Sequence, residues 1–405
     1  MNKDEMSDNK IRILFLLSRF LDGGIDMVLV DYLRHLSCNP TYKLTLAIGV
    51  SMNELEVFAK DVPPQVSVVH FVNADWLTRW RRRKIVKSHL PLAVKLYDEL
   101  CLSPLRRLII RRELRRLTDE HDVVIDFDCC FYSYLKKIDV HKIAWFHFSF
   151  DQLLRQNYRR TQRIGHALES YNKVICISEA MKAEGERLFP ALKNKLFVIY
   201  NAKDYSRILE KAYEEVQDPR IHELYMIAVE RLEESQKDLT TLLKAYRILL
   251  DKYHHQEKLY LLGKGNSENL LRKLVEQLGL SDRVVFLGFH SNPFPWILHS
   301  QLLVHSAKFE GLPTILIEGL MLDKLMVASD CPTGPREILD KGRAGLLFPV
   351  GDANALAESI HTILTDKVVQ DSLLERVSCH RQKFLFSYTE SLFRQIINYW
   401  CPIKN

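Results

Sequence analysis

The sequence predicts an α/β fold of two Rossmann-like domains, each a doubly wound parallel sheet, that face each other across a cleft. Short apolar runs without polar alternation, typical of strands buried on both faces, alternate with helical patterns. This alternation stops at a charged segment and then restarts. The length of 405 residues is also enough for two hydrophobic cores. Ligands of such sheets bind at the carboxyl ends of the strands, which is where we look for functional residues.

The first predicted domain covers residues 1–203. Its helical patterns include Asp26–Leu36 and Ser178–Leu188. The expected strands are Arg12–Ser18, Leu44–Gly49, Val66–Phe71, Val123–Phe127, Lys142–His147, Val174–Ile177 and Leu196–Ile199.

Residues 204–222 are charged and show no helical or strand pattern, so we expect a linker there. The second domain then covers residues 223–385, and residues 386–405 form a C-terminal helix that packs back on the first domain. The expected strands of the second domain are Tyr225–Val229, Lys258–Leu262, Val284–Leu287, Gln301–His305, Leu325–Ser329 and Gly345–Phe348. The expected helices are Leu239–Asp251, Glu268–Gly279, Pro313–Leu322, Ala353–Thr365 and Tyr388–Tyr399.

Composition excludes several classes of protein. The hydrophobic fraction of 47% and the charged fraction of 27% are those of a globular protein, and we find no internal repeat. The N-terminus is acidic where a signal peptide would be basic, and no apolar run is long enough to span a membrane. The eight cysteines are scattered without a C-x-x-C pair, as expected for reduced thiols. We therefore expect a cytoplasmic protein, with the inner face of the plasma membrane as a candidate surface for peripheral attachment.

The most informative segment is HSAKFEGLPTILIEGL, residues 305–320. A buried strand ends near His305, and Pro313 suits the first turn of the helix that follows. Free amides at the start of this helix favour an anion such as phosphate. Glu310 lies at the mouth of the helix, and Glu318 lies five residues into it, about 7 Å along the axis. A nucleotide sugar needs this arrangement, with one carboxylate for sugar hydroxyls, another for ribose hydroxyls and phosphate between them. The alternative is that both carboxylates are ordinary surface residues, but Glu318 lies in an apolar stretch where it needs a partner.

Two cations follow the first strand of the second domain. Arg231 comes directly after it, and Lys237 opens the next helix, so we expect both to reach the cleft. Fixed cations of this kind neutralise a departing nucleoside diphosphate where no metal does so. Ordinary surface charges, paired with the neighbouring acidic residues, are the alternative.

The first domain carries two weaker signals. The paired glycines of Asp22-Gly23-Gly24 follow the first strand and would let backbone amides approach a phosphate, although a plain strand–helix turn is the simpler interpretation. His147 ends a strand and points toward the same cleft, and a structural core histidine is an equal alternative.

Together these motifs resemble the family-4 retaining glycosyltransferases of the GT-B fold, over nearly the whole chain. The most specific matches are FEGLPTILIEGL, ASDCPTGPREIL and GLLFPVGD, at residues 309–320, 328–339 and 345–352. RLEESQKDL, ICISEAMK and VIYNAKD support them. The resemblance implies catalytic roles for Glu310, His147, Arg231 and Lys237. It also implies a donor site formed by Gly24, Arg231, Lys237, Phe289, Glu310, Gly311, Leu312, Pro313, Thr314 and Glu318.

In detail, the resemblance implies that Glu310 holds the donor sugar and Glu318 the ribose, while Arg231 and Lys237 grip the diphosphate. The Gly24 amide would contact phosphate, His147 would lie at the sugar, and the nucleobase would lie near Phe289. No metal and no other cofactor is expected beside the nucleotide sugar.

Three positions depart from the family pattern. Ile25-Asp26-Met27 replaces the usual Glu-Arg after the paired glycines, and Asn201-Ala202 replaces an Asn-Gly. Glu230 stands where the family has a glycine before the diphosphate arginine. This last change places a carboxylate near a phosphate site unless the side chain turns away.

The positive charge is concentrated in residues 79–116. This segment holds thirteen Lys and Arg against three acidic residues, a net charge of +10 in a chain of +6, so the rest carries −4. Trp76, Trp80 and several leucines accompany the cations, which favours an anionic membrane surface or an anionic acceptor. A solvated helical face is the alternative, whereas the acidic remainder and the absence of a binding motif argue against nucleic acid.

We therefore expect a metal-independent, retaining hexosyltransferase that moves a sugar from a nucleotide diphosphate, UDP in our prediction, to a glycan or lipid-linked glycan. The form of ASDCPTGPREIL resembles lipopolysaccharide and capsule enzymes, so bacterial surface polysaccharide is the expected product. A sugar-nucleotide epimerase of the same fold and a non-catalytic nucleotide-sugar-binding scaffold are the alternatives.

Overall fold

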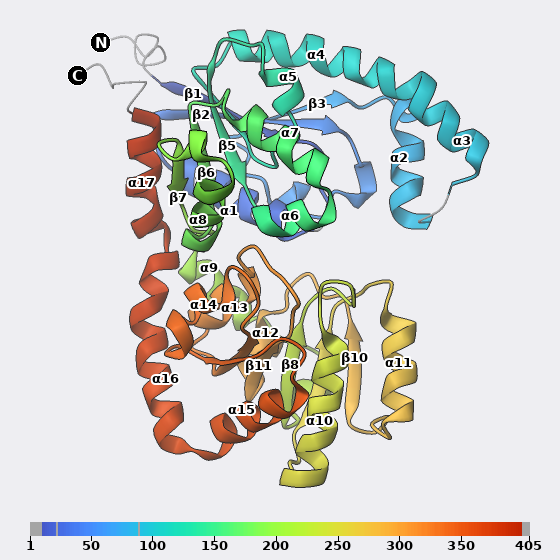
Figure 1. Ribbon diagram of the computed structural model, residues 1–405, viewed down its shortest axis with the longest axis vertical. Helices are drawn as coiled ribbons and strands as arrows, with labels where there is room; N and C mark the ends of the chain where they lie inside the picture. The colour runs from blue at the N-terminus through green and yellow to red at the C-terminus, as the bar shows by residue number, and fades with distance from the viewer. Residues whose placement is uncertain (1–9, 22, 88–89, 399–405) are drawn as a thin grey trace. The chain divides into compact units, whose positions relative to one another are not determined.

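The computed structural model describes residues 10–21, 23–87 and 90–398. The chain divides into two compact units, each described below by itself. The first contains the residues up to 177, residues 182–202 and the chain from 390 onward; the second contains residues 178–181 and 203–389. Each unit has a single parallel sheet with helices packed around it (Figure 1).

The sheet of the first unit has seven parallel strands in the order β3-β2-β1-β4-β5-β6-β7. Central strands such as β1 are almost wholly apolar and buried because helices cover both faces of the sheet. The strands are β1 Ile11–Leu17, β2 Tyr42–Val50, β3 Ser67–Val72, β4 Val123–Asp126, β5 His141–Phe146, β6 Lys173–Cys176 and β7 Leu196–Val198. The helices are α1 Gly24–Ser37, α2 Asp75–Lys87, α3 Leu92–Tyr97, α4 Ser103–Asp119, α5 Tyr132–Leu135, α6 Phe150–Gln156, α7 Tyr158–Leu168 and α8 Glu179–Leu188, with the π-helical turn η4 at Asp98–Leu102 joining α3 to α4.

The sheet of the second unit has six parallel strands in the order β10-β9-β8-β11-β12-β13. These are β8 Tyr225–Val229, β9 Lys258–Leu262, β10 Val284–Gly288, β11 Leu302–His305, β12 Met326–Ser329 and β13 Leu346–Phe348. The helices are α9 Tyr205–Ala212, α10 Leu239–Tyr253, α11 Glu268–Gln277, α12 Phe294–His299, α13 Thr314–Met321, α14 Pro335–Ile338, α15 Ala353–Thr365 and α16 Lys367–His380. Both sheets were predicted, and each expected strand is confirmed to within two residues at either end.

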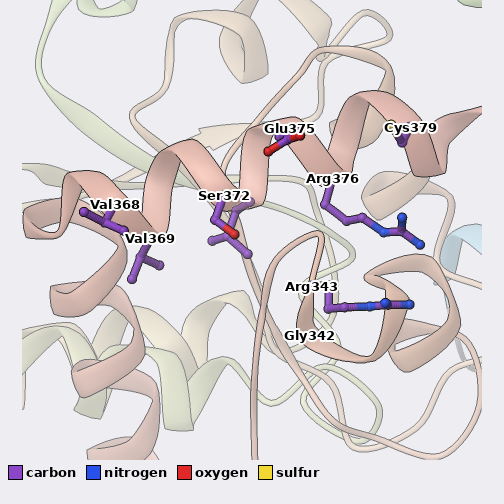
Figure 2. A pocket seen from close by; sticks show the side chains of 9 residues that line it. Gly342, Arg343, Val368, Val369, Ser372, Glu375, Arg376 and Cys379 are labelled. Atoms are coloured by element: carbon purple, nitrogen blue, oxygen red, sulfur yellow. The ribbon is translucent and has the colours of Figure 1, made fainter.

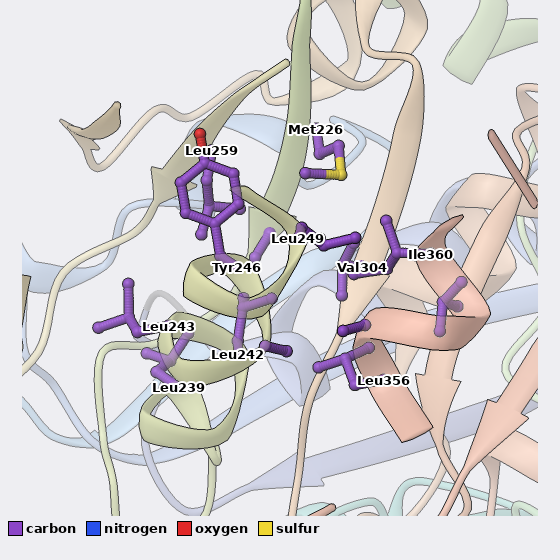
Figure 3. Packing of buried hydrophobic residues seen from close by; sticks show 14 of the residues in the cluster. Met226, Leu239, Leu242, Leu243, Tyr246, Leu249, Leu259, Val304, Leu356 and Ile360 are labelled. Carbon is purple, nitrogen blue, oxygen red and sulfur yellow. The ribbon is translucent and has the colours of Figure 1, made fainter. Parts of the chain in front are cut away.

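Helices α10 and α15 supply much of the second core. Leu242, Leu249 and Tyr246 of α10 and Leu356 and Ile360 of α15 are completely or almost completely buried. Figure 3 shows these side chains converging with residues of β8, β9 and β11. Burial of these side chains stabilises the sheet. The candidate site lies at the carboxyl ends of its strands.

The prediction that residues 204–222 lack regular structure was wrong. They contain α9, and a short 3-10 turn follows at Pro219–His222. Asp204 caps α9 by accepting a hydrogen bond from the Arg207 amide, and the Asn292 side chain donates to the Lys211 carbonyl. The charged composition hid a short amphipathic helix whose apolar residues, such as Ile208, are buried.

The last helix, α17 Phe386–Asn398, belongs mostly to the first unit. The Phe393 ring lies 6.2 Å from the Trp145 ring and 6.4 Å from the Tyr32 ring, centroid to centroid. His35 Nε2 lies 3.0 Å from Glu390 Oε2. These contacts pack α17 against α1 and β5.

Within the described part of the chain, no helix combines the length and the apolar composition that crossing a membrane requires.

Candidate functional site

The candidate site of the second unit begins where β11 ends. His305 is the last residue of β11, Pro313 is the N-cap of α13, and Glu310 lies in the loop between them. The loop is held against a second loop, because the Glu310 amide donates to the Pro332 carbonyl at 3.4 Å and the Thr333 hydroxyl donates to the Glu310 carbonyl. The sequence predicted this strand–loop–helix arrangement.

The Glu310 carboxylate is almost buried and surrounded by cations. Its Oε1 pairs with Lys237 Nζ and lies 3.4 Å from His305 Nε2. Burial alone would raise the pKa of Glu310, but the charges and hydrogen bonds of Lys237 and His305 lower it to about 2. Glu310 is therefore ionised at neutral pH and can accept hydrogen bonds from hydroxyl groups.

Lys237 lies between two carboxylates. Its Nζ contacts Glu310 on one side and lies 3.6 Å from Glu230 Oε2 on the other. Burial lowers the pKa of Lys237, but the charges of Glu310 and Glu230 outweigh burial and raise it above the ordinary value. The ammonium is a permanent charge inside the site, and its role toward a diphosphate stays a prediction.

Glu230, the residue that departs from the family pattern, turns inward. Its side chain is 1% exposed, and its Oε2 lies 3.2 Å from His305 Nδ1. The carboxylate is thus directed at a histidine and a lysine inside the unit, away from solvent. His305 is equally buried and was not singled out by the sequence, although its place at the end of β11 is the position where site residues collect.

Arg231 is the exposed cation of the site. Its Nη2 donates to Gln236 Oε1 at 3.1 Å, and Gln236 Nε2 lies 3.4 Å from Glu310 Oε2. Gln236 therefore links the exposed guanidinium to the buried carboxylate. The structure brings Arg231, Lys237 and Glu310 into one group, as the sequence predicted.

Glu318 forms a separate pair. It is the fifth residue of α13 and is buried, and its Oε1 lies 2.9 Å from Lys203 Nζ. Lys203 is 2% exposed, and its amide donates to the Phe384 carbonyl at 2.8 Å. The sequence required a partner for this carboxylate but did not identify Lys203. The VIYNAKD motif contains this lysine and was the available signal.

The sequence also assigned Phe289 and the segment from Gly311 to Thr314 to the donor site. Phe289 is 42% exposed and stacks beneath Lys264, whose Nζ lies 4.6 Å from the ring centroid. The loop Gly311-Leu312-Pro313 is packed tightly, because a Cβ on Gly334 would come within 2.8 Å of the Gly311 carbonyl oxygen. Gly334 also has a φ of +75°, so a larger residue there would displace the start of α13, where Thr314 is the first helical residue.

His147 and Gly24 belong to the first unit. The buried His147 ring lies 4.7 Å from the Phe127 ring, and its Nε2 has no hydrogen-bond partner among the described residues. Burial lowers the pKa of His147 to about 3, opposed by a hydrogen bond with the Phe127 backbone, so the imidazole is neutral. The unpartnered Nε2 fits either a ligand contact or a core histidine.

The side chain of Asp26 contacts the turn formed by the paired glycines. Gly24 is the first residue of α1, and the Gly23 amide donates to Asp26 Oδ2 at 2.9 Å. Asp26 thus occupies the Gly23 amide, and the contact of the Gly24 amide with phosphate stays a prediction. Asp22 lies outside the described residues.

One pocket lies elsewhere on the second unit. Figure 2 shows it along α16, lined by residues such as Arg343, Val369 and Arg376. None of the residues predicted from the sequence lines this pocket.

With this geometry in place, comparison with known proteins identifies the second unit. Residues 211–379 match the family described as glycosyl transferases group 1. This region is thus similar to the glycosyl transferases group 1 family. It contains Glu310, Glu318, Arg231 and Lys237, and the resemblance drawn from the motifs is confirmed.

Curated relatives match parts of the chain. An uncharacterized glycosyltransferase of Methanocaldococcus jannaschii is 35% identical over 174 residues, 41% of either chain. A Campylobacter jejuni N-acetylgalactosamine-N,N'-diacetylbacillosaminyl-diphospho-undecaprenol 4-alpha-N-acetylgalactosaminyltransferase is 28% identical over 196 residues, 48% of this chain and 52% of that one. The Escherichia coli lipopolysaccharide 1,6-galactosyltransferase is 26% identical over 271 residues, 63% of this chain and 70% of that one. This chain thus spans about half or less of the first two relatives.

Solved structures extend the likeness of fold to both units. Anabaena HepE, in complex with UDP and glucose, has a TM-score of 0.73 at 16% identity, covering 95% of this chain and 99% of that one. The lipopolysaccharide outer core galactosyltransferase WaaB has a TM-score of 0.68 at 16% identity, covering 96% and 99%. The GT-B fold predicted from the sequence is confirmed.

Proposed function

We propose that this protein transfers a hexosyl group from a nucleoside diphosphate sugar to a glycan or lipid-linked glycan in the synthesis of a bacterial surface polysaccharide. The observation that carries the proposal is the ionised, nearly buried Glu310 held by Lys237 inside the region similar to the glycosyl transferases group 1 family. The class of acceptor is supported by two relatives, the Campylobacter jejuni transferase named for a diphospho-undecaprenol substrate and the Escherichia coli lipopolysaccharide galactosyltransferase. The HepE complex with UDP and glucose supports UDP as the nucleotide.

In this proposal each charged group has a task toward the donor. Glu310 accepts hydrogen bonds from donor-sugar hydroxyls, and Glu318 accepts those of the ribose. Arg231, the exposed cation beside Glu310, neutralises the charge that develops on the leaving diphosphate, aided by Lys237. The nucleobase lies near Phe289. The phosphate contact of Gly24 and the sugar contact of His147 stay predictions from the resemblance.

We further propose that transfer needs no divalent metal and retains the anomeric configuration. The arginine and the lysine supply fixed positive charge at the diphosphate, the task that a metal has in other transferases. Retention would follow a front-face displacement, in which the acceptor attacks from the side the diphosphate leaves. No protein nucleophile is assigned in this scheme.

We propose that the first unit docks on an anionic membrane through α3, η4 and α4. Leu92, Leu96, Leu100 and Leu108 are exposed, three of them by 63–72%, and recur at helical spacing. The exposed cations Arg107, Arg111, Arg112 and Arg115 accompany them on α4. This combination of apolar residues and cations complements anionic lipid.

Not all of the basic segment belongs to that surface. Arg106 is buried, and its guanidinium donates to Asp98 Oδ1 at 2.8 Å and to the Leu77 carbonyl at 2.6 Å. Arg81 and Arg82 pair with Asp98 and Asp75. From the sequence, these three arginines were among the candidate surface cations. In the structure their ion pairs stabilise α2 and η4.

A panel of nucleotide sugars tests the proposed function. Purified protein is incubated with each donor and with lipid-linked glycan acceptors, and both nucleoside diphosphate and glycosylated product are measured. We expect one donor to give product with release of the diphosphate. Isomerised nucleotide sugar without acceptor consumption would identify an epimerase, and binding without turnover would identify a scaffold.

A further inference from the structure

Four buried ionisable side chains meet in the second unit: Glu230, Lys237, His305 and Glu310. His305 lies between the two carboxylates, with Nδ1 3.2 Å from Glu230 and Nε2 3.4 Å from Glu310. Lys237 also contacts both carboxylates. Lys237 and His305 therefore each lie close to both Glu230 and Glu310. We call these four residues the quartet.

The charges of the quartet balance only if His305 holds two protons. Two carboxylates and one ammonium leave one negative charge, which an imidazolium cancels. An uncompensated charge in a buried site is costly, so the neutral arrangement is favoured. Burial and the Lys237 charge lower the pKa of His305, but the nearby Glu230 and Glu310 carboxylates outweigh them and raise it.

Three further ionisable groups lie near the quartet. Asp238 is buried next to Lys237, and its amide donates to the Ser306 carbonyl at 3.1 Å. Arg231 is exposed and acts on Lys237 from outside. Cys331 is buried, and burial raises the pKa of its thiol to about 12, so it is neutral across the range in which His305 titrates.

We infer that Glu230 and His305 form a positioning pair, in which the His305 imidazolium cancels the Glu230 charge and holds the Glu310 carboxylate and the Lys237 ammonium in place for the nucleotide diphosphate. The inference rests on the proposed function and explains how a carboxylate is tolerated beside a predicted phosphate site. Neither residue need touch the substrate. Each acts through Lys237 and Glu310.

The pair makes a prediction that differs from simple packing. Removing the positive charge with His305→Gln leaves Glu230 and Glu310 with a single cation, which should weaken UDP binding about tenfold or more. Glu230→Gln in that background removes the excess negative charge and should restore most of the affinity. Two residues that only fill space would not regain affinity when the charge of the second is removed.

Isothermal titration of UDP against the wild type, His305→Gln, Glu230→Gln and the double variant measures this cycle, with thermal melts to verify folding. Recovery of affinity in the double variant supports the pair. Equal affinity in His305→Gln and wild type, or additive losses, overturns it.

An NMR titration tests the same inference without any ligand. The His305 ring signals, assigned by their loss in His305→Gln, should titrate above the ordinary histidine value of 6.5 in the wild type and below it in Glu230→Gln. A wild-type His305 that is already neutral at pH 6.5 overturns the inference. If the protein bound no nucleotide, the proposed function would fail while this titration still decided the charge of His305.

Discussion

Lys203 Nζ lies 2.9 Å from Glu318 Oε1, and both side chains are almost completely buried. This pair explains how a carboxylate persists in the apolar helix α13, whose residues 315–321 are all buried. It also means that Glu318 has two tasks, because it neutralises Lys203 and, in our proposal, binds the ribose. Experiments on Glu318 must separate the two.

Glu318→Ala should lower both stability and nucleotide affinity. Loss of the carboxylate leaves Lys203 buried without its counter-charge, which costs about 3–5 kcal/mol in the free energy of unfolding. Lost ribose hydrogen bonds should weaken UDP binding by about 1–3 kcal/mol. Chemical denaturation and calorimetric titration measure the two effects.

The double variant Lys203→Met, Glu318→Leu separates them. It replaces the ion pair by apolar side chains of similar size and should recover most of the stability, while UDP affinity stays low. Recovery of both quantities would show that Glu318 is only the partner of Lys203.

Arg231→Ala should impair turnover without destabilising the fold. Arg231 is exposed and donates a hydrogen bond to the Gln236 side chain, whereas Lys237 is buried between two carboxylates and would be a poor probe. We expect a loss of about 2–4 kcal/mol in kcat/KM, as for loss of a preorganised transition-state donor. Wild-type rates should be the same with EDTA and with Mg²⁺. Activity that EDTA abolishes and Mg²⁺ or Mn²⁺ restores would refute metal independence.

The fold was predictable because parallel strands buried on both faces give continuous apolar runs. β8 and β9 match their predicted bounds. The helix α9 escaped prediction because its charged residues outnumber the few apolar ones that it buries. Which residues of α9 are buried could be known only from its packing on the rest of the unit.

The site was predictable where the chemistry is local in sequence. Glu310 and Glu318 lie in one continuous motif, so their separation along the chain could be read directly from the sequence. Lys203 was missed because its ion pair with Glu318 joins residues far apart in the sequence. His305 is close to Glu310 in the sequence, but its pairing with Glu230, which follows a different strand, was not predictable from a single sequence. The inward orientation of Glu230 was undetermined for the same reason.

Three substitutions on α4 should weaken membrane binding. Arg107, Arg111 and Arg115 are exposed, so changing them to Gln removes three charges without disturbing the buried Arg106–Asp98 pair. Each charge should contribute about 1 kcal/mol on anionic vesicles. Co-sedimentation with anionic and neutral vesicles measures the loss, which high salt should reproduce in the wild type.

The matched control changes Lys244, Lys252 and Lys273 to Gln, three exposed cations on α10 and α11. It alters the net charge equally, so it should partition as the wild type does. If both variants lost vesicle binding equally, the attraction would depend on net charge alone, and α4 would not be a docking surface. Leu92→Ser with Leu100→Ser tests the apolar part of the surface separately.

His147 should make the protein less stable in acid. Its pKa is about 3 in the folded state, whereas the unfolded chain has the ordinary value of 6.5. Between these values only the unfolded state binds the proton, so the free energy of unfolding falls by up to about 1.4 kcal/mol for each pH unit below 6.5. The contribution of a neutral His147 is therefore fully present above pH 6.5 and is lost toward pH 3.

His147→Gln provides the comparison, because glutamine gains no proton. Urea unfolding at pH 7 and pH 5 should show a loss in the wild type that exceeds that of the variant by about 2 kcal/mol. The same loss in both proteins would mean that His147 titrates normally in the folded state.

The central claim is that the ionised Glu310 carboxylate serves transfer from a nucleotide diphosphate sugar. The most direct measurement is acceptor-dependent release of UDP from UDP-hexose donors by wild type and Glu310→Gln at neutral pH, with UDP affinity measured in parallel. We expect the wild type to release UDP in step with glycosylated product and Glu310→Gln to lose turnover by about 100-fold or more, as for a lost transition-state contact, in a variant that still folds. Wild-type turnover in Glu310→Gln, or no transfer by the wild type from any nucleotide sugar to any lipid-linked glycan, would contradict the claim.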